Sequence, residues 1–194
     1  MIISETWAYV HIPRTGGKTL KQAYIEAGHS ADHVDCFSQI TGVSQAALHM
    51  REHTKFSHWD NLVGDRNVFT IVRNPYDRIT SLWRRYKDIA HTLPDAYNLN
   101  VNTSITFASF LKEPATGWSL STTQKEFIAS DSKSVTVYKF ETDLAQAYTD
   151  HGLTIIDAIN AAQDTENILD DPENLALVND IFDEDFTEFG YEKR

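Results

Sequence analysis

The sequence predicts an α/β protein in which a central parallel sheet is flanked by helices on both faces, within one domain of residues 1–194. Three short apolar segments rich in β-forming residues supply the strands: 7–12 (WAYVHI), 67–72 (NVFTIV) and 135–140 (VTVYKF). Segments with helical spacing of apolar residues lie between them. Because connections of this length join parallel strands, the alternation favours three layers of helices, sheet and helices.

In the first third of the chain, a helix is predicted over 18–27, with Gly28 placed to end it. A second short strand is expected over 33–37, and a short helix over 44–50. The first strand and the first helix are separated only by a tight loop.

Pro75 is predicted to lie in the first turn of a helix that extends to about residue 89, since a missing N–H group is harmless there. The polar segment 92–121 is predicted to be a surface loop that contains one helix at 105–111. Further helices are expected over 121–129, 141–148 and 172–189. The last of these places apolar residues on one stripe: Leu175, Val178, Phe182 and Phe186.

Composition narrows the class of protein. The 194 residues are 41% hydrophobic, which suffices for a sizeable core. No run approaches the roughly 18 apolar residues of a membrane span, and no export signal begins the chain, so we expect a soluble cytoplasmic protein. The single cysteine, Cys36, fits a reducing compartment.

The net charge of −11 is unevenly distributed. Residues 1–140 hold 15 basic and 13 acidic residues, whereas residues 141–194 hold 2 and 15. The acidic segment argues against nucleic acid as a partner, while a small anionic ligand can still meet local positive charge in the first two thirds.

The loop between the first strand and the first helix reads PRTGGKT at 13–19. Two glycines at this point let the backbone turn tightly and direct N–H groups at an anion, to which the helix N-terminus adds its positive dipole end. Charged groups and hydroxyls suited to phosphate or sulfate come from Arg14, Thr15, Lys18 and Thr19. The end of the loop resembles a Walker A motif, although that motif needs glycine at Ile12, so a nucleotide-dependent kinase is one alternative.

A second anion site is predicted at FTIVRNPYDRITSLW, residues 69–83. Arg73 follows a buried strand and is expected at the carboxyl edge of the sheet, where open α/β folds bind ligands. Ser81 lies about two turns into the next helix. Both can reach one phosphate if the chain bends back at Asn74 and Pro75, which proline favours.

These two segments, in this order, resemble the sulfotransferases that use 3′-phosphoadenosine 5′-phosphosulfate. Residues 11–20 (HIPRTGGKTL) resemble their 5′-phosphosulfate loop, usually PKTGGTS in the carbohydrate enzymes, and residues 69–83 resemble their 3′-phosphate motif. The resemblance implies a P-loop NTPase-like fold. It also implies that Arg14, Thr15, Gly16, Gly17, Lys18 and Thr19 hold the 5′ end of the donor, while Arg73 and Ser81 hold its 3′-phosphate.

The same resemblance indicates the residues of the reaction. At the position of Arg14 the family usually has Lys, and at the position of Lys18 it usually has Thr or Ser. Either Arg14 or Lys18 is therefore a candidate to stabilise the leaving phosphate. The stretch from His53 to Phe56 is similar to the one that carries the base in the uronyl 2-O-sulfotransferases, which favours His53 as base. Glu52 is the alternative, because some sulfotransferases use a glutamate. The implied acceptor is a carbohydrate hydroxyl, and no metal is required.

Weaker similarities to the family are the pair Gln124 and Phe127, the segment 137–144 (VYKFETDL) and the ending 182–191 (FDEDFTEFGY).

Two other interpretations come from different classes. His49, Glu52 and His53 spell H-x-x-E-H, the pattern of inverted zinc proteases, but this leaves the loop and Arg73 unexplained. A binding module that has the nucleotide site without the chemistry is the other.

Overall fold

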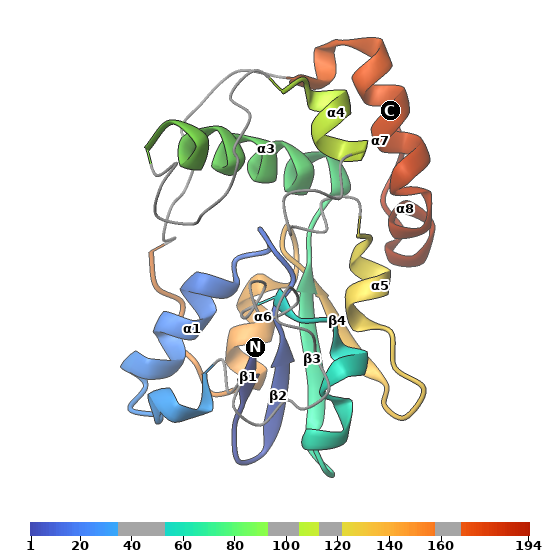
Figure 1. The fold of residues 1–194 in the computed structure, drawn as a ribbon. Helices are drawn as coiled ribbons and strands as arrows, with labels where there is room; N and C mark the ends of the chain where they lie inside the picture. The colour runs from blue at the N-terminus through green and yellow to red at the C-terminus, as the bar shows by residue number, and fades with distance from the viewer. Residues whose placement is uncertain (35–52, 93–104, 113–121, 158–167) are drawn as a thin grey trace. The chain divides into compact units, whose positions relative to one another are not determined.

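The computed structural model describes residues 1–34, 53–92, 105–112, 122–157 and 168–194, with the side chains of 89–92 left out. The chain divides into two compact units: unit 1 comprises 1–73 and 124–161, and unit 2 comprises 74–123 and 162–194. Figure 1 shows the course of the chain through both. Within the described residues, no helix combines the length and the hydropathy that crossing a bilayer demands.

Unit 1 contains a four-stranded sheet in the order β1 (Ile2–Ile3), β2 (Trp7–Val10), β3 (Asn67–Val72) and β4 (Val135–Lys139). Strands β2, β3 and β4 are parallel, whereas β1 pairs with β2 in the antiparallel direction. The α/β class is confirmed. The wholly parallel sheet predicted from the sequence is wrong at this one edge.

A tight hairpin explains the extra strand. The Ser4 amide donates to Trp7 O at 2.9 Å, and the Ser4 hydroxyl accepts from the Trp7 amide, also at 2.9 Å. Ser4 thereby closes the turn through which the chain reverses between β1 and β2. Since β1 is only two residues long, its sequence carries no alternating pattern from which a strand could be predicted.

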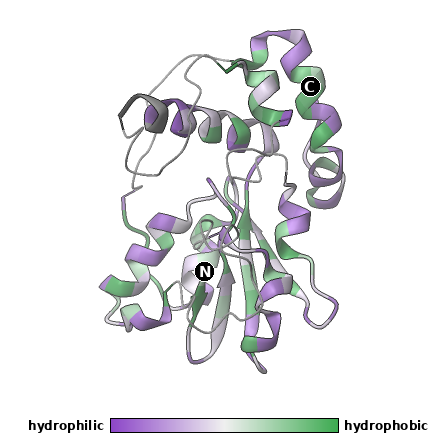
Figure 2. Cartoon of the chain, viewed as in Figure 1, coloured by the Kyte–Doolittle hydropathy of each residue, from purple (hydrophilic) through white to green (hydrophobic). Residues whose placement is uncertain are grey.

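Each face of the sheet is covered. Successive residues of a strand point to opposite faces, so Tyr9 packs with α1 (Gly17–Glu26) and α6 (Leu144–Asp150), while Ala8 and Val10 face the other way. The second face packs against Phe56, Trp59, Val63 and, in α5 (Gln124–Ile128), Ile128. Helix α1 alternates between hydrophilic and hydrophobic residues in Figure 2, as an amphipathic helix requires.

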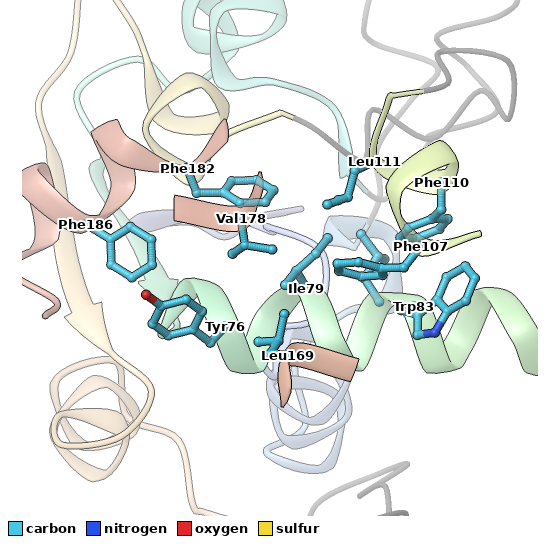
Figure 3. Close-up of a cluster of buried hydrophobic side chains, with 11 residues drawn as sticks. Tyr76, Ile79, Trp83, Phe107, Phe110, Leu111, Leu169, Val178, Phe182 and Phe186 are labelled. Carbon is cyan, nitrogen blue, oxygen red and sulfur yellow. The ribbon is translucent and has the colours of Figure 1, made fainter. Parts of the chain in front are cut away.

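Unit 2 is helical in the residues described. It contains α3 (Pro75–Thr92), α4 (Phe107–Lys112), the short 3₁₀ helix η7 (Ile168–Asp170), α7 (Pro172–Ile181) and α8 (Asp183–Phe189). Figure 3 shows that α3, α4, α7 and α8 contribute to one apolar cluster. Its buried members are Tyr76, Ile79, Leu82, Trp83, Phe107, Phe110, Leu111, Leu169, Val178, Phe182 and Phe186.

The helix predicted over 172–189 is two helices, so this expectation is wrong in its continuity. The chain leaves helical geometry at Phe182, with φ −106° and ψ 21°. Three acidic residues then occupy 183–185, where they favour the N-terminus of a new helix. Val178, Phe182 and Phe186 still share one buried cluster, as their spacing predicts.

Of the strand predicted over 33–37, the structure describes only His33 and Val34, and these two residues do not form a strand. Residues 31–33 form a 3₁₀ helix because the Ser30 hydroxyl accepts a hydrogen bond from the Asp32 amide at 3.2 Å. Val34 makes an isolated antiparallel bridge with Ile2. Residues 35–37 and the helix predicted over 44–50 lie outside the described residues.

Candidate functional site

The candidate site lies at the carboxyl edge of the parallel strands in unit 1. Strand β2 ends at Val10, and β3 ends at Val72. Because the two strands are parallel neighbours, the loop after β2 and Arg73 after β3 emerge at the same edge. Phe140, which follows β4, joins them there through its amide, which donates to Val72 O at 2.7 Å.

The loop has an unusual backbone. Arg14 has a φ of 67°, in the left-handed region that residues other than glycine rarely occupy, and Gly16 has a φ of 88°. Gly16 is the N-cap of α1, and its carbonyl accepts from the Leu20 amide at 3.1 Å. The first amides of an α-helix have no intrahelical acceptor, so they can bind an anion at this end.

Both glycines are required by their neighbours. A Cβ atom at Gly17 would lie 1.9 Å from His11 Cδ2, and a Cβ atom at Gly16 would lie 3.0 Å from the Phe140 ring. The side chains of His11 and Phe140 therefore pack directly on the loop backbone and fix its course.

The other loop residues differ in exposure. Thr15 is fully buried, and its hydroxyl donates to Ile12 O at 3.0 Å, so this hydroxyl closes the loop on itself. Arg14 is half-buried and Lys18 is exposed. None of the described carboxylates pairs with Lys18.

Arg73 contacts the loop directly. Its Nη1 donates to Arg14 O at 3.4 Å, and its guanidinium lies 4.9 Å from the centre of the Phe140 ring. No carboxylate in the described part of the chain pairs with Arg73. The structure thus brings Arg73 together with Arg14 and, through Phe140, with Gly16.

The backbone of Arg73 is held by Gln124. The Gln124 side chain accepts from the Arg73 amide at 2.9 Å and donates to the Arg73 carbonyl at 2.8 Å. The sequence indicated Gln124 only through the family resemblance. Phe140 lies in the predicted strand 135–140 and in the similar segment 137–144, but nothing marked it as a site residue because an apolar residue at the end of a strand carries no signal of its own.

His53 lies beside the first strand. Its Nδ1 is 3.2 Å from His11 O, the two imidazole rings are 4.3 Å apart, and only 8% of its surface is exposed. Buried Phe56 and Trp59 anchor the segment that follows, and Trp59 Nε1 donates to Thr54 O at 3.3 Å. His49 and Glu52 lie outside the described residues.

His11 is an unexpected member of the site. Burial lowers the pKa of His11 well below its usual range, and the positive charges of His53, Lys21, the N-terminus and Lys18 act in the same direction. The ring is therefore neutral at pH 7. Its Nδ1 is buried and has no hydrogen-bond partner among the described residues.

Ser81 belongs to unit 2. It lies on α3, and 6% of its surface is exposed. The predicted residues that the structure gathers are therefore those of unit 1, namely the loop, Arg73 and His53. Where residues are described, no group of three or more His, Cys, Asp or Glu side chains could hold a metal ion.

Comparison of the chain with protein-family models, curated proteins and solved structures gave no match.

Proposed function

We propose that this protein is a sulfotransferase that uses 3′-phosphoadenosine 5′-phosphosulfate. In this proposal, the loop from Arg14 to Thr19 holds the 5′-phosphosulfate, and Arg73 holds the 3′-phosphate. The family resemblance assigns Ser81 to the same phosphate. The observation that carries it is the contact between Arg73 Nη1 and Arg14 O, which joins the two predicted anion-binding segments at one sheet edge.

Charge and backbone geometry at this edge support such a ligand. Arg73 has no carboxylate partner in the described part of the chain, and a guanidinium suits a phosphate. The His11 ring packs on Gly17 and fixes the course of the loop backbone, and Gly16 is the N-cap of α1, whose first amides suit an anion.

When bound, the donor supplies a sulfuryl group that passes in line to an acceptor hydroxyl. Arg14 and Lys18 are the candidates to neutralise the leaving phosphate, since both extend from the loop. Arg14 is fixed in the left-handed conformation, whereas Lys18 is exposed on the first turn of α1.

His53 takes the acceptor's proton in this proposal. A carbonyl oxygen only accepts hydrogen bonds, so the contact with His11 O requires the proton on His53 Nδ1. In the neutral ring, Nε2 is then the basic nitrogen. The acceptor class favoured by the resemblance is a carbohydrate hydroxyl.

Thermal shift tests the ligand. We expect adenosine 3′,5′-bisphosphate to raise the melting temperature more than ATP with Mg²⁺ does. Arg73→Ala and Ser81→Ala should each abolish most of this shift. Arg66→Ala is the matched control because Arg66 also bonds to backbone carbonyls, those of Ser4 and Val63, but precedes β3 at the opposite end of the strand.

A larger shift with ATP would instead support a kinase. Transfer of labelled sulfate to a panel of sugars, lipids, phenols and peptides tests the activity. His53→Ala should reduce transfer by about 100-fold or more if His53 is the base. Bisphosphate binding without transfer to any acceptor would favour a binding module.

A further inference from the structure

Gln124 makes a two-point contact with the backbone of Arg73. Its Oε1 accepts from the Arg73 amide at 2.9 Å, and its Nε2 donates to the Arg73 carbonyl at 2.8 Å. An amide side chain can accept through its oxygen and donate through its nitrogen at the same time, so Gln124 bonds both backbone polar groups of Arg73. Gln124 is itself fully buried, so water does not compete for either bond.

These two bonds satisfy the backbone of Arg73 just beyond the end of the sheet, where none of the described strands bonds to it. The last backbone bond between β3 and the chain after β4 is the one from the Phe140 amide to Val72 O. Arg73 is the next residue, and Asn74 precedes a proline, which disfavours a helical conformation for Asn74. Without Gln124, the peptide groups of Arg73 would lack these bonds at the position from which its guanidinium reaches the loop.

Helix α5, which carries Gln124, is anchored in unit 1 by a buried side chain and by an ion pair. Gln124 is the first residue of α5, whose Phe127 is buried in unit 1. Glu126, on the same helix, forms an ion pair with Lys55, in the segment that follows His53. The helix thus presents the Gln124 amide from a fixed position.

Two further contacts hold the side chain of Arg73. Nη1 donates to Arg14 O, and Phe140 lies under the guanidinium. Phe140 also packs on Gly16. A shift of the Arg73 backbone therefore moves the guanidinium away from both the loop carbonyl and the ring.

We infer that Gln124 is a positioning residue for Arg73, setting the place of its guanidinium for the 3′-phosphate of the nucleotide. The inference rests on the proposed function. It predicts a specific defect: loss of Gln124 weakens the preference for a nucleotide that has a 3′-phosphate over one that lacks it. A residue that only stabilised the fold would leave this preference unchanged.

The experiment compares adenosine 3′,5′-bisphosphate with adenosine 5′-monophosphate by titration calorimetry on the full chain. The quantity measured is the ratio of their dissociation constants. Gln124→Met removes both hydrogen bonds at similar volume, and we expect it to reduce the wild-type preference about tenfold. Gln124→Glu retains the acceptor and loses the donor, so it should give a smaller reduction. Gln146→Met, the same change at an exposed position on α6, should leave the preference intact.

A double variant ties the effect to Arg73. Arg73→Ala should abolish the preference, and adding Gln124→Met to it should cause no further loss, because both substitutions act on one interaction. If Arg73→Ala abolishes the preference while both Gln124 variants keep it within twofold, the inference about Gln124 is wrong and the proposed function stands.

Equal weakening of both ligands by Gln124→Met, or failure of both Gln124 variants to fold, would also overturn the inference, since Gln124 would then serve only the fold. A wild-type protein that shows no preference for the bisphosphate would overturn the proposed function and this inference together.

Discussion

Gly17 shows how one missing side chain shapes the candidate site. Its φ is not in the left-handed region, so its backbone alone would tolerate alanine. The obstacle is the His11 ring, which would lie within 1.9 to 2.7 Å of an added Cβ atom. Gly28 is the opposite case: its φ is 86°, yet nothing lies within 4 Å of an added Cβ atom.

The two glycines give a matched pair of variants. Gly17→Ala should destabilise the protein by about 3 kcal/mol through overpacking and should abolish nucleotide binding, since His11 or the loop must move. Gly28→Ala should cost about 1 kcal/mol from its left-handed conformation and leave binding unchanged. Urea unfolding and calorimetric titration measure both effects. Equal binding by the two variants would show that the packing of His11 does not set the shape of the loop.

At the scale of elements, a buried charge connects α3 with α8 inside unit 2. Arg78 is 1% exposed, and its Nη1 and Nη2 each lie 3.3 Å from Thr122 O. Burial lowers the pKa of Arg78 to about 10, and the charge of Asp185, which is fully buried on α8, opposes that shift. The Phe182 ring lies 5.8 Å from the guanidinium. Arg78 therefore remains charged at neutral pH within an apolar surrounding.

Removing the charge of Asp185 alone should destabilise unit 2 more than removing the charges of both Asp185 and Arg78. Asp185→Asn should lower the free energy of unfolding by about 3 kcal/mol because it removes the charge that opposes the effect of burial on Arg78. Arg78→Met combined with Asp185→Leu should recover most of that loss. Asp183 lies on the same helix as Asp185 and makes an exposed ion pair with Lys193, so Asp183→Asn should change stability by less than about 1 kcal/mol. If Asp185→Asn is as mild as this control, the charge of Asp185 does not stabilise unit 2.

For the whole molecule, buried histidines couple stability to pH. Burial lowers the pKa of His11 and also that of His151, whose ring stacks on Phe69 with centroids 3.6 Å apart. In the unfolded chain, both take up protons near their ordinary value of about 6.5. Because the unfolded state then binds more protons than the folded state, stability decreases as pH falls below that value.

We expect the free energy of unfolding to decrease between pH 7 and pH 5. The slope from His11 approaches 1.4 kcal/mol per pH unit, the limit of about one proton. His11→Phe retains a ring and removes the titration, so the slope should become shallower. His58→Gln, at an exposed position, should leave it as in the wild type. Urea unfolding at half-unit pH intervals tests this, and an unchanged slope in His11→Phe would contradict it.

Several elements could be predicted because their signals are local. Strand β3 has the bounds that the NVFTIV segment indicates, and α3 begins at Pro75 as expected. Helix α1 starts at Gly17, the second glycine of the pair, one residue before the predicted start. In each case, neighbouring residues supply the cause: a continuous apolar run, a proline at the first turn, or glycines at a tight bend.

Other features depend on residues far apart in the chain. The pairing of β2 with β3 sets Tyr9 beside Phe69, and that of β3 with β4 sets Val68 beside Val135. The contact between Gln124 and Arg73 spans 51 positions. No local pattern encodes such pairings.

The sequence by itself determined the α/β class, the three parallel strands and the two basic segments, because periodicity, proline, glycine and charge act on residues close to them in the chain. Only the tertiary structure decided that Arg73 reaches the Arg14 carbonyl, that Phe140 lies against both Arg73 and Gly16, and that His11 fills the space beside Gly17. These contacts form between separate strands, and which side chains meet at a sheet edge depends on strand order and register.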